Sequence, residues 1–290
     1  MPRFLGSHLT LSEGIDKVLK ILDLGLINTA QVHPSPPQMW LKNKFSKKVS
    51  SKLSQLCNHK SLEKLFFHGI YLINLASPNK DLVSKSIYSI LAYLELLHEI
   101  NGEAVVFHPG SITDEAPIDA GLSRVAETIS TLLKAQDWKP NSILLEVSAG
   151  KSHVVGSQLW HLSKIRQMLG NHPAIGIALD TQHLWASGYD LKNNLDQLIS
   201  EIRSLDLLNS IKLIHINDSK TSLGSHIDRH ENIGDGFLGR EFFGKLFAVS
   251  DFTNIPFVLE TPRVKTVDGA LQEIKTCLSL AEFEFKLKQS

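Results

Sequence analysis

Histidine, aspartate and glutamate side chains in this sequence fall repeatedly at or just after the end of a short apolar run. Imidazole and carboxylate groups bind divalent metal ions, and a set without thiolates suits zinc, manganese or iron. Richness in histidine favours zinc among these metals. The candidate metal ligands are His68, His108, Glu146, Asp180, His183, His215, Asp228, His230 and Glu260.

These candidates are too many for one ion, because a tetrahedral zinc site needs only four ligands. A carboxylate can also bridge two ions, so the set predicts two or three metals. Three divalent ions set against four carboxylates would leave a net charge of about +2. A site of that charge attracts phosphate groups.

Each candidate also has an ordinary structural explanation when it is taken alone. A single histidine near a strand is more often a hydrogen-bonded structural residue than a ligand, and Glu146 or Glu260 alone would suggest a salt bridge. The complete set, with carboxylate and imidazole close together in DTQH (180–183) and DRH (228–230), favours a metal centre. Six further histidines are interpreted as surface or packing residues: His59, His98, His153, His161, His172 and His226. His8 and His33 end the first two apolar runs, and a supporting or substrate-contacting role stays open for both.

The elements that must position these ligands are eight short apolar runs, each ending in a polar or glycine-containing turn. They lie at 3–8, 26–33, 65–72, 103–110, 142–150, 174–183, 211–219 and 255–262. Segments with helical spacing of apolar residues lie between them, at 14–25, 80–100 and 193–208. Strands that are apolar on both faces and alternate with helices predict a parallel sheet, and eight of them predict a TIM (β/α)₈ barrel. An open doubly wound sheet is the alternative.

Composition sets further bounds on the class of protein. The chain has 290 residues, enough for one α/β barrel domain over 1–290, and neither low-complexity linkers nor repeats divide it. Its 30 basic and 30 acidic residues exclude a strongly basic protein, so any attraction for nucleic acid must be local. Two distant cysteines give no disulfide framework, and no apolar run resembles a signal peptide or a membrane span. We therefore expect a cytoplasmic, intracellular monomer that does not bind membranes.

The motifs around the candidate ligands resemble the endonuclease IV family of apurinic/apyrimidinic (AP) endonucleases. The resemblance covers about residues 3–280, and the motifs follow one another in an order and spacing similar to those of the family. It rests on GSHLT (6–10), HGIYLINLASP (68–78), FHPGS (107–111), LEVSAG (145–150), ALDTQHLWASGYDL (178–191), HINDSK (215–220), DRHENIGDGFLG (228–239) and LETP (259–262).

The resemblance implies a xylose-isomerase-like TIM barrel that holds three Zn²⁺ ions, with Mn²⁺ as a partial substitute. The first ion would be held by His68, His108 and Glu146. The second would share Glu146 and add Asp180, His215 and Glu260, and the third would take His183, Asp228 and His230. Glu146 and Glu260 are the implied catalytic residues.

The activity implied by the resemblance is hydrolysis, by a metal-activated water, of the phosphodiester bond on the 5′ side of an abasic nucleotide. The partner would be double-stranded DNA with abasic or oxidatively damaged sites, in base excision repair. The products would be a 3′-hydroxyl and a 5′-deoxyribose phosphate, and a 3′-phosphodiesterase activity is also implied as an option. The reaction needs neither a serine nor a cysteine nucleophile.

Recognition of an abasic site requires bending of the DNA and side chains that fill the gap in the base stack. Tyr71 and Leu72 match family positions that enter the DNA, although the sequence alone fits barrel core equally well. Trp40 lies in a segment with five lysines, at 36–52, that can supply local positive charge or form a solvated helix face. Arg229, in the loop at 219–236, is a candidate phosphate contact.

Two positions depart from the family pattern. Pro37, in SPPQMW, stands where the family commonly has an arginine, which puts one DNA contact in doubt. Val147 replaces an asparagine of the family's ENTAG, which puts catalytic efficiency in doubt but not metal binding.

Two other functions are compatible with these residues. A sugar isomerase or epimerase of a related barrel family would use one or two ions and would not need His183, Asp228 and His230. A non-cleaving binder of damaged DNA is opposed by the intact Glu146 and Glu260. A barrel fold alone does not separate these functions.

Overall fold

A closed barrel of parallel strands forms the centre of the computed structural model, which describes residues 2–9, 11 and 15–281. Going round the barrel, the strands are β1 (Leu5–His8), β2 (Thr29–Val32), β3 (Lys64–His68), β4 (Ala104–Phe107), β6 (Ile143–Glu146), β8 (Ile175–Asp180), β9 (Ile211–Ile216) and β12 (Phe257–Leu259). The last strand pairs with the first, where Leu5 lies opposite Phe257. The barrel is therefore closed, and the alternative of an open sheet is wrong.

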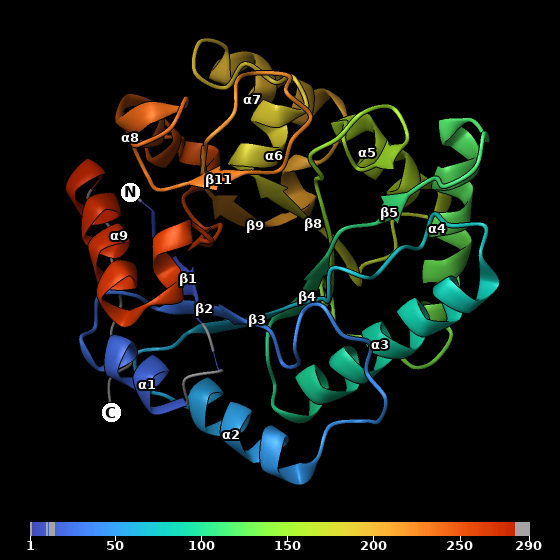
Figure 1. Cartoon of the computed structure of the whole chain (residues 1–290), viewed down its shortest axis with the longest axis horizontal. Helices are drawn as coiled ribbons and strands as arrows, with labels where there is room; N and C mark the ends of the chain where they lie inside the picture. Colours follow the sequence, from blue (N-terminus) through green and yellow to red (C-terminus); the bar gives the residue numbers. More distant parts are fainter. Residues whose placement is uncertain (1, 10, 12–14, 282–290) are drawn as a thin grey trace.

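Helices surround the barrel on its outside, as Figure 1 shows. They are α1 (Ile15–Asp23), α2 (Lys47–Cys57), α3 (Lys80–Glu99), α4 (Ile118–Leu133), α5 (Leu159–Met168), α6 (Thr181–Ala186), α7 (Leu195–Ser204), α8 (Gly239–Phe247) and α9 (Val267–Leu280). Short 3₁₀ turns lie at Leu208–Ser210, Ser250–Phe252 and Pro262–Lys265. The longest helix, α3, begins at a cap that fits its sequence, because the Asn79 side chain accepts hydrogen bonds from the backbone of Asp81 and Leu82.

Two small antiparallel ribbons extend the loops that follow the barrel strands. The first pairs β5 (Gly110–Ser111) with β7 (Val154–Val155), and the second pairs β10 (Asp218–Ser219) with β11 (His230–Glu231). The first ribbon joins the loops that follow β4 and β6, and the second folds the segment after β9 back on itself, both at the carboxyl ends of the strands. That end of a barrel is where active sites are built.

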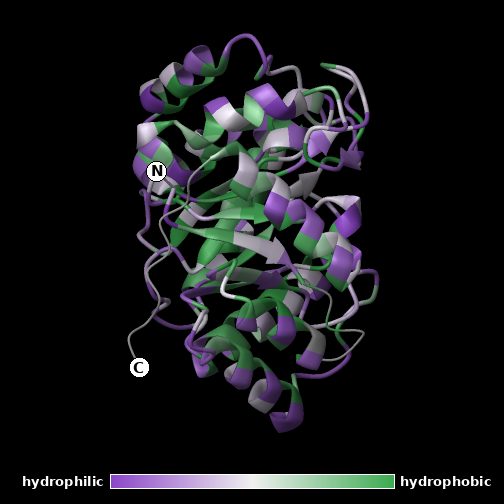
Figure 2. Cartoon of the chain, turned by 90° about the vertical axis from the view of Figure 1, so that its left-hand side faces the viewer, coloured by the Kyte–Doolittle hydropathy of each residue, from purple (hydrophilic) through white to green (hydrophobic). Residues whose placement is uncertain are grey.

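The barrel interior is filled by one small group of side chains that alternate along the strands. These are Phe66, Ala104, Val106, Leu144, Ala178, Leu213 and Val258, all at most 1% exposed. The residues between them point outward into a larger core beneath the helices, and Figure 2 shows the hydrophobic residues gathered in the central strands. Because strand side chains alternate with a period of two, the next inward position after Leu144 is Glu146, and after Leu213 it is His215. The candidate ligands thus form the layer directly above the interior core.

The predicted elements agree with this architecture, with adjustments at their ends. All eight predicted runs contain a barrel strand, but the run at 65–72 is strand only as far as His68, and the run at 174–183 changes to α6 after Asp180. The helices expected at 80–100 and 193–208 are present as α3 and α7, and that at 14–25 as α1, although Gly14 lies outside the described residues. The one-domain prediction also includes 282–290, which lie outside them. In the described part of the chain, no helix is long and apolar enough to cross a membrane.

Candidate metal centre

The candidate ligands converge at the carboxyl ends of the barrel strands, although they are spread over more than half of the chain. Their ligand atoms form three groups in which all atoms lie within 4.8 Å of one another. The groups are His68, His108 and Glu146; Glu146, Asp180, His215 and Glu260; and Asp180, His183 and His230. Eight of the nine predicted ligands belong to these groups, and Asp228 lies beside the third.

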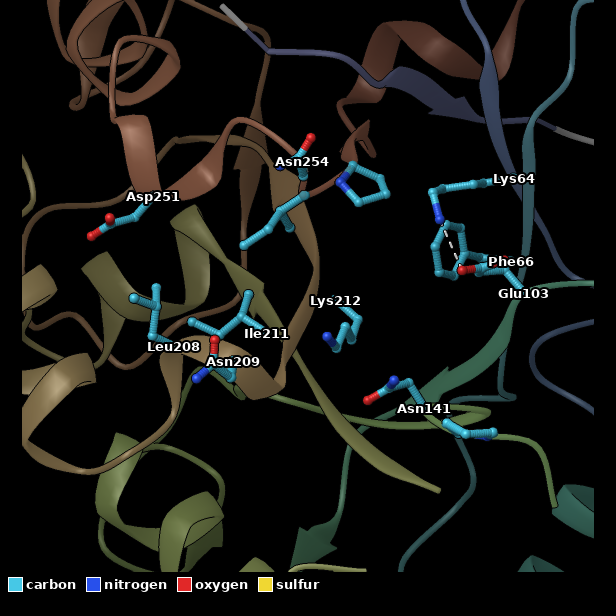
Figure 3. Close-up of a pocket in the computed structure, with 13 residues that line it drawn as sticks. Lys64, Phe66, Glu103, Asn141, Leu208, Asn209, Ile211, Lys212, Asp251 and Asn254 are labelled. Atoms are coloured by element: carbon cyan, nitrogen blue, oxygen red, sulfur yellow. Dashed lines mark hydrogen bonds and ion pairs between the residues drawn. The ribbon is translucent and has the colours of Figure 1, made fainter. Parts of the chain in front are cut away.

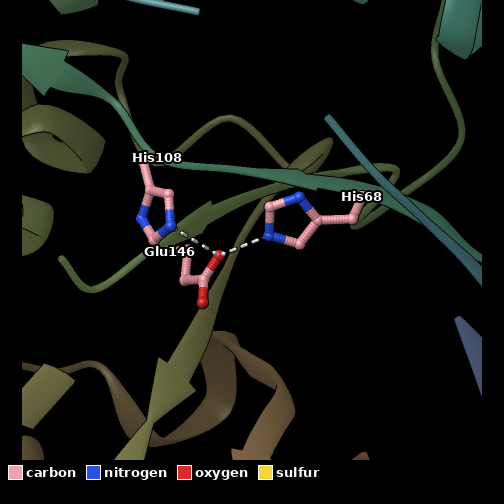
Figure 4. A group of neighbouring side chains, drawn as sticks. All are labelled: His68, His108 and Glu146. Carbon is pink, nitrogen blue, oxygen red and sulfur yellow. Dashed lines mark hydrogen bonds and ion pairs between the residues drawn. The ribbon is translucent and has the colours of Figure 1, made fainter. Parts of the chain in front are cut away.

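Glu146 belongs to two of the groups, and its two carboxylate oxygens face different ones. Nε2 of His68 lies 3.1 Å from Oε2 and Nε2 of His108 lies 3.6 Å from it, as Figure 4 shows. Nδ1 of His215 instead lies 2.7 Å from Oε1. A carboxylate that directs one oxygen to each of two clusters has the arrangement needed to bridge two metal ions.

The second group surrounds Nδ1 of His215, which is fully buried. Besides Glu146, Oε2 of Glu260 lies 3.3 Å from this nitrogen and Oδ2 of Asp180 lies 3.9 Å from it. Oδ2 of Asp180 is also 3.9 Å from Nε2 of His230 in the third group. Asp180 therefore stands between the second and third groups, a place that the sequence did not reveal.

The third group contains two imidazoles besides Asp180, and the carboxylate of Asp228 lies beside them. Nε2 of His183 and Nε2 of His230 lie 3.4 Å apart, and Asp228 places one oxygen 3.5 Å from the first and the other 3.2 Å from the second. The Asp228 side chain is 57% exposed, whereas that of His183 is 3% exposed. The third group consequently lies at the edge of the centre that is open to solvent.

The outer nitrogen of each imidazole is occupied by an oxygen, so the inner nitrogen faces the cluster. Nδ1 of His68 donates to the carbonyl oxygen of Gly69 at 2.8 Å, and Nδ1 of His183 donates to that of Val147 at 3.0 Å. Nδ1 of His230 lies 3.2 Å from the carbonyl oxygen of Glu260. His108 and His215 are held in the same way, by the Ser148 hydroxyl and the Gln31 amide oxygen. This pattern is typical of metal-ligating histidines, whose second nitrogen is held by a neighbouring group.

Burial and charge act in opposite directions on these groups. Burial lowers the pKa of His68 and His230, but the neighbouring carboxylates Glu146 and Asp228 outweigh it and raise both values to about 9. Burial likewise raises the pKa of Glu146, yet His108 and His215 hold it well below its usual range. Glu146 is therefore ionised, and protons on His68 and His230 supply positive charge where a cation would otherwise do so.

The donor set and its geometry fit divalent metal ions. Imidazole nitrogens and carboxylate oxygens point toward shared centres, and the absence of thiolates from the groups agrees with ions that accept nitrogen and oxygen ligands. A metal ion would also compensate the buried carboxylates, whose desolvation is costly without a partner.

Gln31 is a supporting residue that the sequence did not single out. It is fully buried on β2, and its amide donates to Oε1 of Glu260 while its amide oxygen faces Nε2 of His215 at 2.9 Å. It therefore fixes two ligands of the second group at once. Its position two residues before His33, on the inward face of a strand, is the signal that could have identified it.

Asn217, just after β9, and Asp218, on β10, support the same end of the barrel. Nδ2 of Asn217 donates to Oδ2 of Asp180 at 2.7 Å, and its amide oxygen accepts the backbone N–H of Glu260 at 3.1 Å. The buried carboxylate of Asp218 accepts backbone N–H groups of four residues in the following loop and at the start of α8. These are Gly234, Gly236, Leu238 and Gly239. The loop that follows His230 is thus held by one carboxylate.

The two strand-end histidines with an open role lie beside the centre. Nδ1 of His8 is 3.2 Å from Oε1 of Glu260, so this imidazole supports a candidate ligand. Nδ1 of His33 donates to the carbonyl oxygen of His68 at 3.0 Å, and its ring centroid lies 5.6 Å from that of Tyr71. His33 therefore lies between the centre and the rim.

The candidate DNA contacts occupy different environments. Tyr71 is 61% exposed at the rim, so the barrel-core interpretation of this residue is wrong, whereas Leu72 and Trp40 are half-buried and pack against the core. Arg229 is exposed next to Asp228, whose carbonyl oxygen accepts a hydrogen bond from its guanidinium at 2.7 Å. The carbonyl of Pro37 accepts the backbone N–H of Tyr71 at 2.9 Å, so this loop positions the exposed tyrosine.

The lysines of the segment 36–52 are exposed, and three of them lie on α2. Lys44 pairs with Glu95 on α3, with Nζ 2.6 Å from Oε2. Part of the expected positive charge is therefore neutralised within the protein.

Comparisons with known proteins agree with this geometry. The family model described as the xylose isomerase-like TIM barrel matches residues 20–280. The chain is 33% identical over 265 residues to a protein of Chloroflexus aggregans named probable endonuclease 4, covering 91% of this chain and 92% of that one.

Solved structures with the same fold include proteins of different activities. The structure of endonuclease IV from Thermus thermophilus is similar with a TM-score of 0.80 and 24% identity, over 96% of this chain and all of that one. A D-tagatose 3-epimerase-like protein is similar with a TM-score of 0.71 and 17% identity, over 96% of each chain. These two likenesses bear on the fold alone.

Metal binding at this centre is predicted to weaken as the pH falls. His68 and His230, with pKa values of about 9, carry protons at neutral pH without a metal, and a metal must displace those protons. Affinity should therefore rise with pH until about 9 and fall steadily below it. Metal content after dialysis against a chelator, measured by atomic emission at several pH values, tests this.

The matched control is a histidine outside the centre. His68→Asn should lower the metal content at every pH, and His172→Asn, in the turn before β8, should leave it unchanged. Metal retention that is independent of pH, or equal in the two variants, would contradict the assignment.

Proposed function

The chain belongs to the endonuclease IV family of xylose isomerase-like TIM barrels, and on that premise we propose that it cleaves DNA at abasic sites in base excision repair. Specifically, it hydrolyses the phosphodiester bond on the 5′ side of the abasic nucleotide and leaves a 3′-hydroxyl and a 5′-deoxyribose phosphate. The observation that carries the proposal is Glu146, which directs one oxygen into each of two ligand groups while a third group stands beside them.

Three Zn²⁺ ions are the proposed cofactors, with Mn²⁺ as a partial substitute. His68, His108 and Glu146 would hold the first; Glu146, Asp180, His215 and Glu260 the second; and His183, Asp228 and His230 the third. When bound, such ions supply Lewis-acid stabilisation of the phosphate charge and an acidified water.

The chain's own residues hold this machinery in place. Glu146 and Glu260, the proposed catalytic residues, both face Nδ1 of His215, where the first two groups meet. His8 and Gln31 hold Oε1 of Glu260, which leaves Oε2 directed at the centre. An ion held by the third group, the group nearest to solvent, would supply charge stabilisation for the leaving 3′ oxygen.

A nucleophilic side chain is not needed for this reaction. Cys277 is fully buried and its pKa is raised by burial, so its thiol is unreactive. Removal of 3′-blocking groups, as a phosphodiesterase, would use the same centre. Action as an intracellular monomer on double-stranded DNA remains part of the proposal.

A sugar isomerase or epimerase is the second candidate because its barrel fold is shared. The group of His183, Asp228 and His230 favours the endonuclease, since an isomerase needs one or two ions. The exposed Tyr71 at the rim favours a large substrate that covers the mouth. Incubation with duplex DNA carrying one abasic analogue, with and without prolonged chelation, separates the two. Metal-dependent cleavage on the 5′ side supports the endonuclease, whereas isomerisation of a free sugar without cleavage contradicts it.

Glu146→Gln should reduce cleavage at least about a hundredfold, because metal-supplied charge stabilisation amounts to several kcal/mol. The neutral amide cannot serve both ligand groups, although it keeps the volume of the side chain. Single-turnover cleavage of an abasic duplex measures the loss, and circular dichroism checks the fold. Glu127→Gln, on the exposed side of α4, is the matched control and should cleave normally. Full activity of Glu146→Gln would refute the shared carboxylate.

Gln31→Leu should lower metal affinity or activity about 10- to 100-fold, as is usual for residues that hold a ligand. The apolar side chain has a similar size, but it neither donates to Glu260 nor accepts from His215. Metal content after graded chelation gives a readout that does not depend on activity. Gln197→Leu, on the exposed face of α7, is the control. Unchanged metal retention in Gln31→Leu would show that Gln31 only fills space.

Tyr71→Ala should weaken binding of abasic duplex about tenfold or more, because aromatic stacking on bases contributes about 1–3 kcal/mol. Binding of intact duplex should change less if Tyr71 fills the gap left by the missing base. Fluorescence anisotropy in a Glu146→Gln background measures both affinities without cleavage. Tyr88→Ala, 39% exposed on α3, is the control. An equal loss for both duplexes would assign Tyr71 to general DNA contact instead.

A further inference from the structure

A cavity opens at the end of the barrel opposite the metal centre, where the strands begin. Its volume is about 420 Å³, within the range of small-molecule sites. It is lined by residues at the amino ends of β3, β6, β9 and β12 and by the adjoining loops, shown in Figure 3. The metal centre lies at the carboxyl ends of the same strands, so the two sites are separated by the interior core.

Two local features of β8 and β9 accommodate Lys212 at this cavity. Ile211 pairs with Ile177 and Leu213 pairs with Ala178, so one extra residue, Lys212, is inserted into β9 as a bulge. The facing residue on β8 is Gly176, where a Cβ would lie 2.6 Å from Cδ2 of Leu144 and 3.2 Å from Cγ of Lys212. At the lowest layer of the barrel, the aliphatic part of the Lys212 side chain therefore occupies a position that is normally filled by an apolar side chain.

Lys212 is the uncompensated charge of this cavity. Nζ of Lys64 pairs with Oε1 of Glu103 at 2.9 Å, and Asp251 pairs with Arg203 at 2.5 Å. Among the residues that the structure describes, no carboxylate pairs with Lys212. Both carboxylates of the lining are thus paired with other cations, and the ammonium group of Lys212 has no carboxylate partner.

Neutral hydrogen-bond donors flank this ammonium group. Figure 3 shows Lys212 near the middle of the lining, with Asn141 on one side and Asn209 on the other. Neither asparagine side chain has a hydrogen-bond partner within the described residues, so their amides are available to a ligand. One point charge with adjacent amide donors suits a phosphate or carboxylate group.

Part of the remaining wall is apolar, and its polar part consists of Lys64, Glu103, Asp251 and Asn254. Phe66 and Ile211 are buried, and Pro140 and Pro256 complete the wall near them. A ligand of this cavity would therefore carry an anionic group at one end and a flat or apolar group at the other. The opening is at the end of the barrel away from the metal centre, so the ligand is not the DNA strand under cleavage.

We propose that this cavity is a second binding site, which takes a small phosphate monoester with an aromatic or apolar group. Lys212 binds the phosphate, Asn141 and Asn209 donate hydrogen bonds to it, and the apolar part of the wall beside Pro140 and Pro256 contacts the apolar group. The site is independent of the proposed cleavage reaction, and its occupancy requires neither DNA nor the metal ions.

The test uses adenosine monophosphate as the probe, titrated into the metal-loaded protein by calorimetry. We expect saturable binding in the millimolar range or tighter, and a loss of about tenfold or more in Lys212→Met, as for a hydrogen bond to a charged group. Lys85→Met, on the exposed side of α3, removes the same charge and should bind normally. Thermal unfolding checks that both variants are folded.

A metal-centre variant excludes binding at the other end of the barrel. His108→Asn should leave affinity for the nucleotide unchanged, because His108 lies at the carboxyl end. Absence of saturable binding, a loss in His108→Asn in place of Lys212→Met, or equal losses in both lysine variants would overturn the proposal. Inorganic phosphate should bind more weakly than the nucleotide, and equal affinity would overturn the role of the apolar wall.

Discussion

The burial of the Glu146 carboxylate is the constraint on which the rest of the centre depends. A carboxylate without solvent is strongly unfavourable unless positive charge and hydrogen bonds compensate it. Here imidazoles approach both of its oxygens, His68 from one side and His215 from the other. Each of those imidazoles must in turn be held, which explains why Gln31 is itself fully buried. The polar network therefore extends outward from one side chain until it reaches backbone carbonyls and solvent.

The barrel positions the ligands around Glu146 because each strand carries an apolar layer of side chains below and a polar layer above. Val106 on β4 is followed two residues later by His108, just after the strand, and Leu144 is followed by Glu146 on β6. The lower members pack the interior without polar atoms, and the upper members are fixed because the strands beneath them are rigid. Hydrogen bonding between neighbouring strands also sets the relative height of the ligands, since Asp180 lies opposite His215 in the register of β8 and β9. Sheet register thus brings together the ligands of the first two groups, whereas His183, Asp228 and His230 lie beyond the barrel strands.

Sequence reasoning could identify the barrel and the ligand set because both depend on periodic patterns. Apolar runs that end in His, Asp or Glu revealed strand ends, and a parallel sheet places strand ends together. The patterns could not reveal which oxygen of Glu146 faces which group, or that Asp180 stands between two of them, because those facts depend on side-chain rotamers and register. Gln31 was missed for a related reason: a lone glutamine in an apolar strand has no distinctive motif. The bulge at Lys212 breaks the period of two, so no regular pattern could predict its inward direction.

The departure at Val147 shows why some positions of such a centre tolerate change. The side chain of Val147 is buried in the core, but its carbonyl oxygen holds Nδ1 of His183 at 3.0 Å. A backbone carbonyl is present whatever the side chain, so replacing asparagine by valine leaves the orientation of His183 intact. Gln31 differs, because its contacts to His215 and Glu260 come from side-chain atoms alone. We therefore expect substitutions around the centre to be tolerated where a backbone atom makes the supporting contact, and not where a side-chain atom makes it. The distance of a residue from the ligands predicts this tolerance less well.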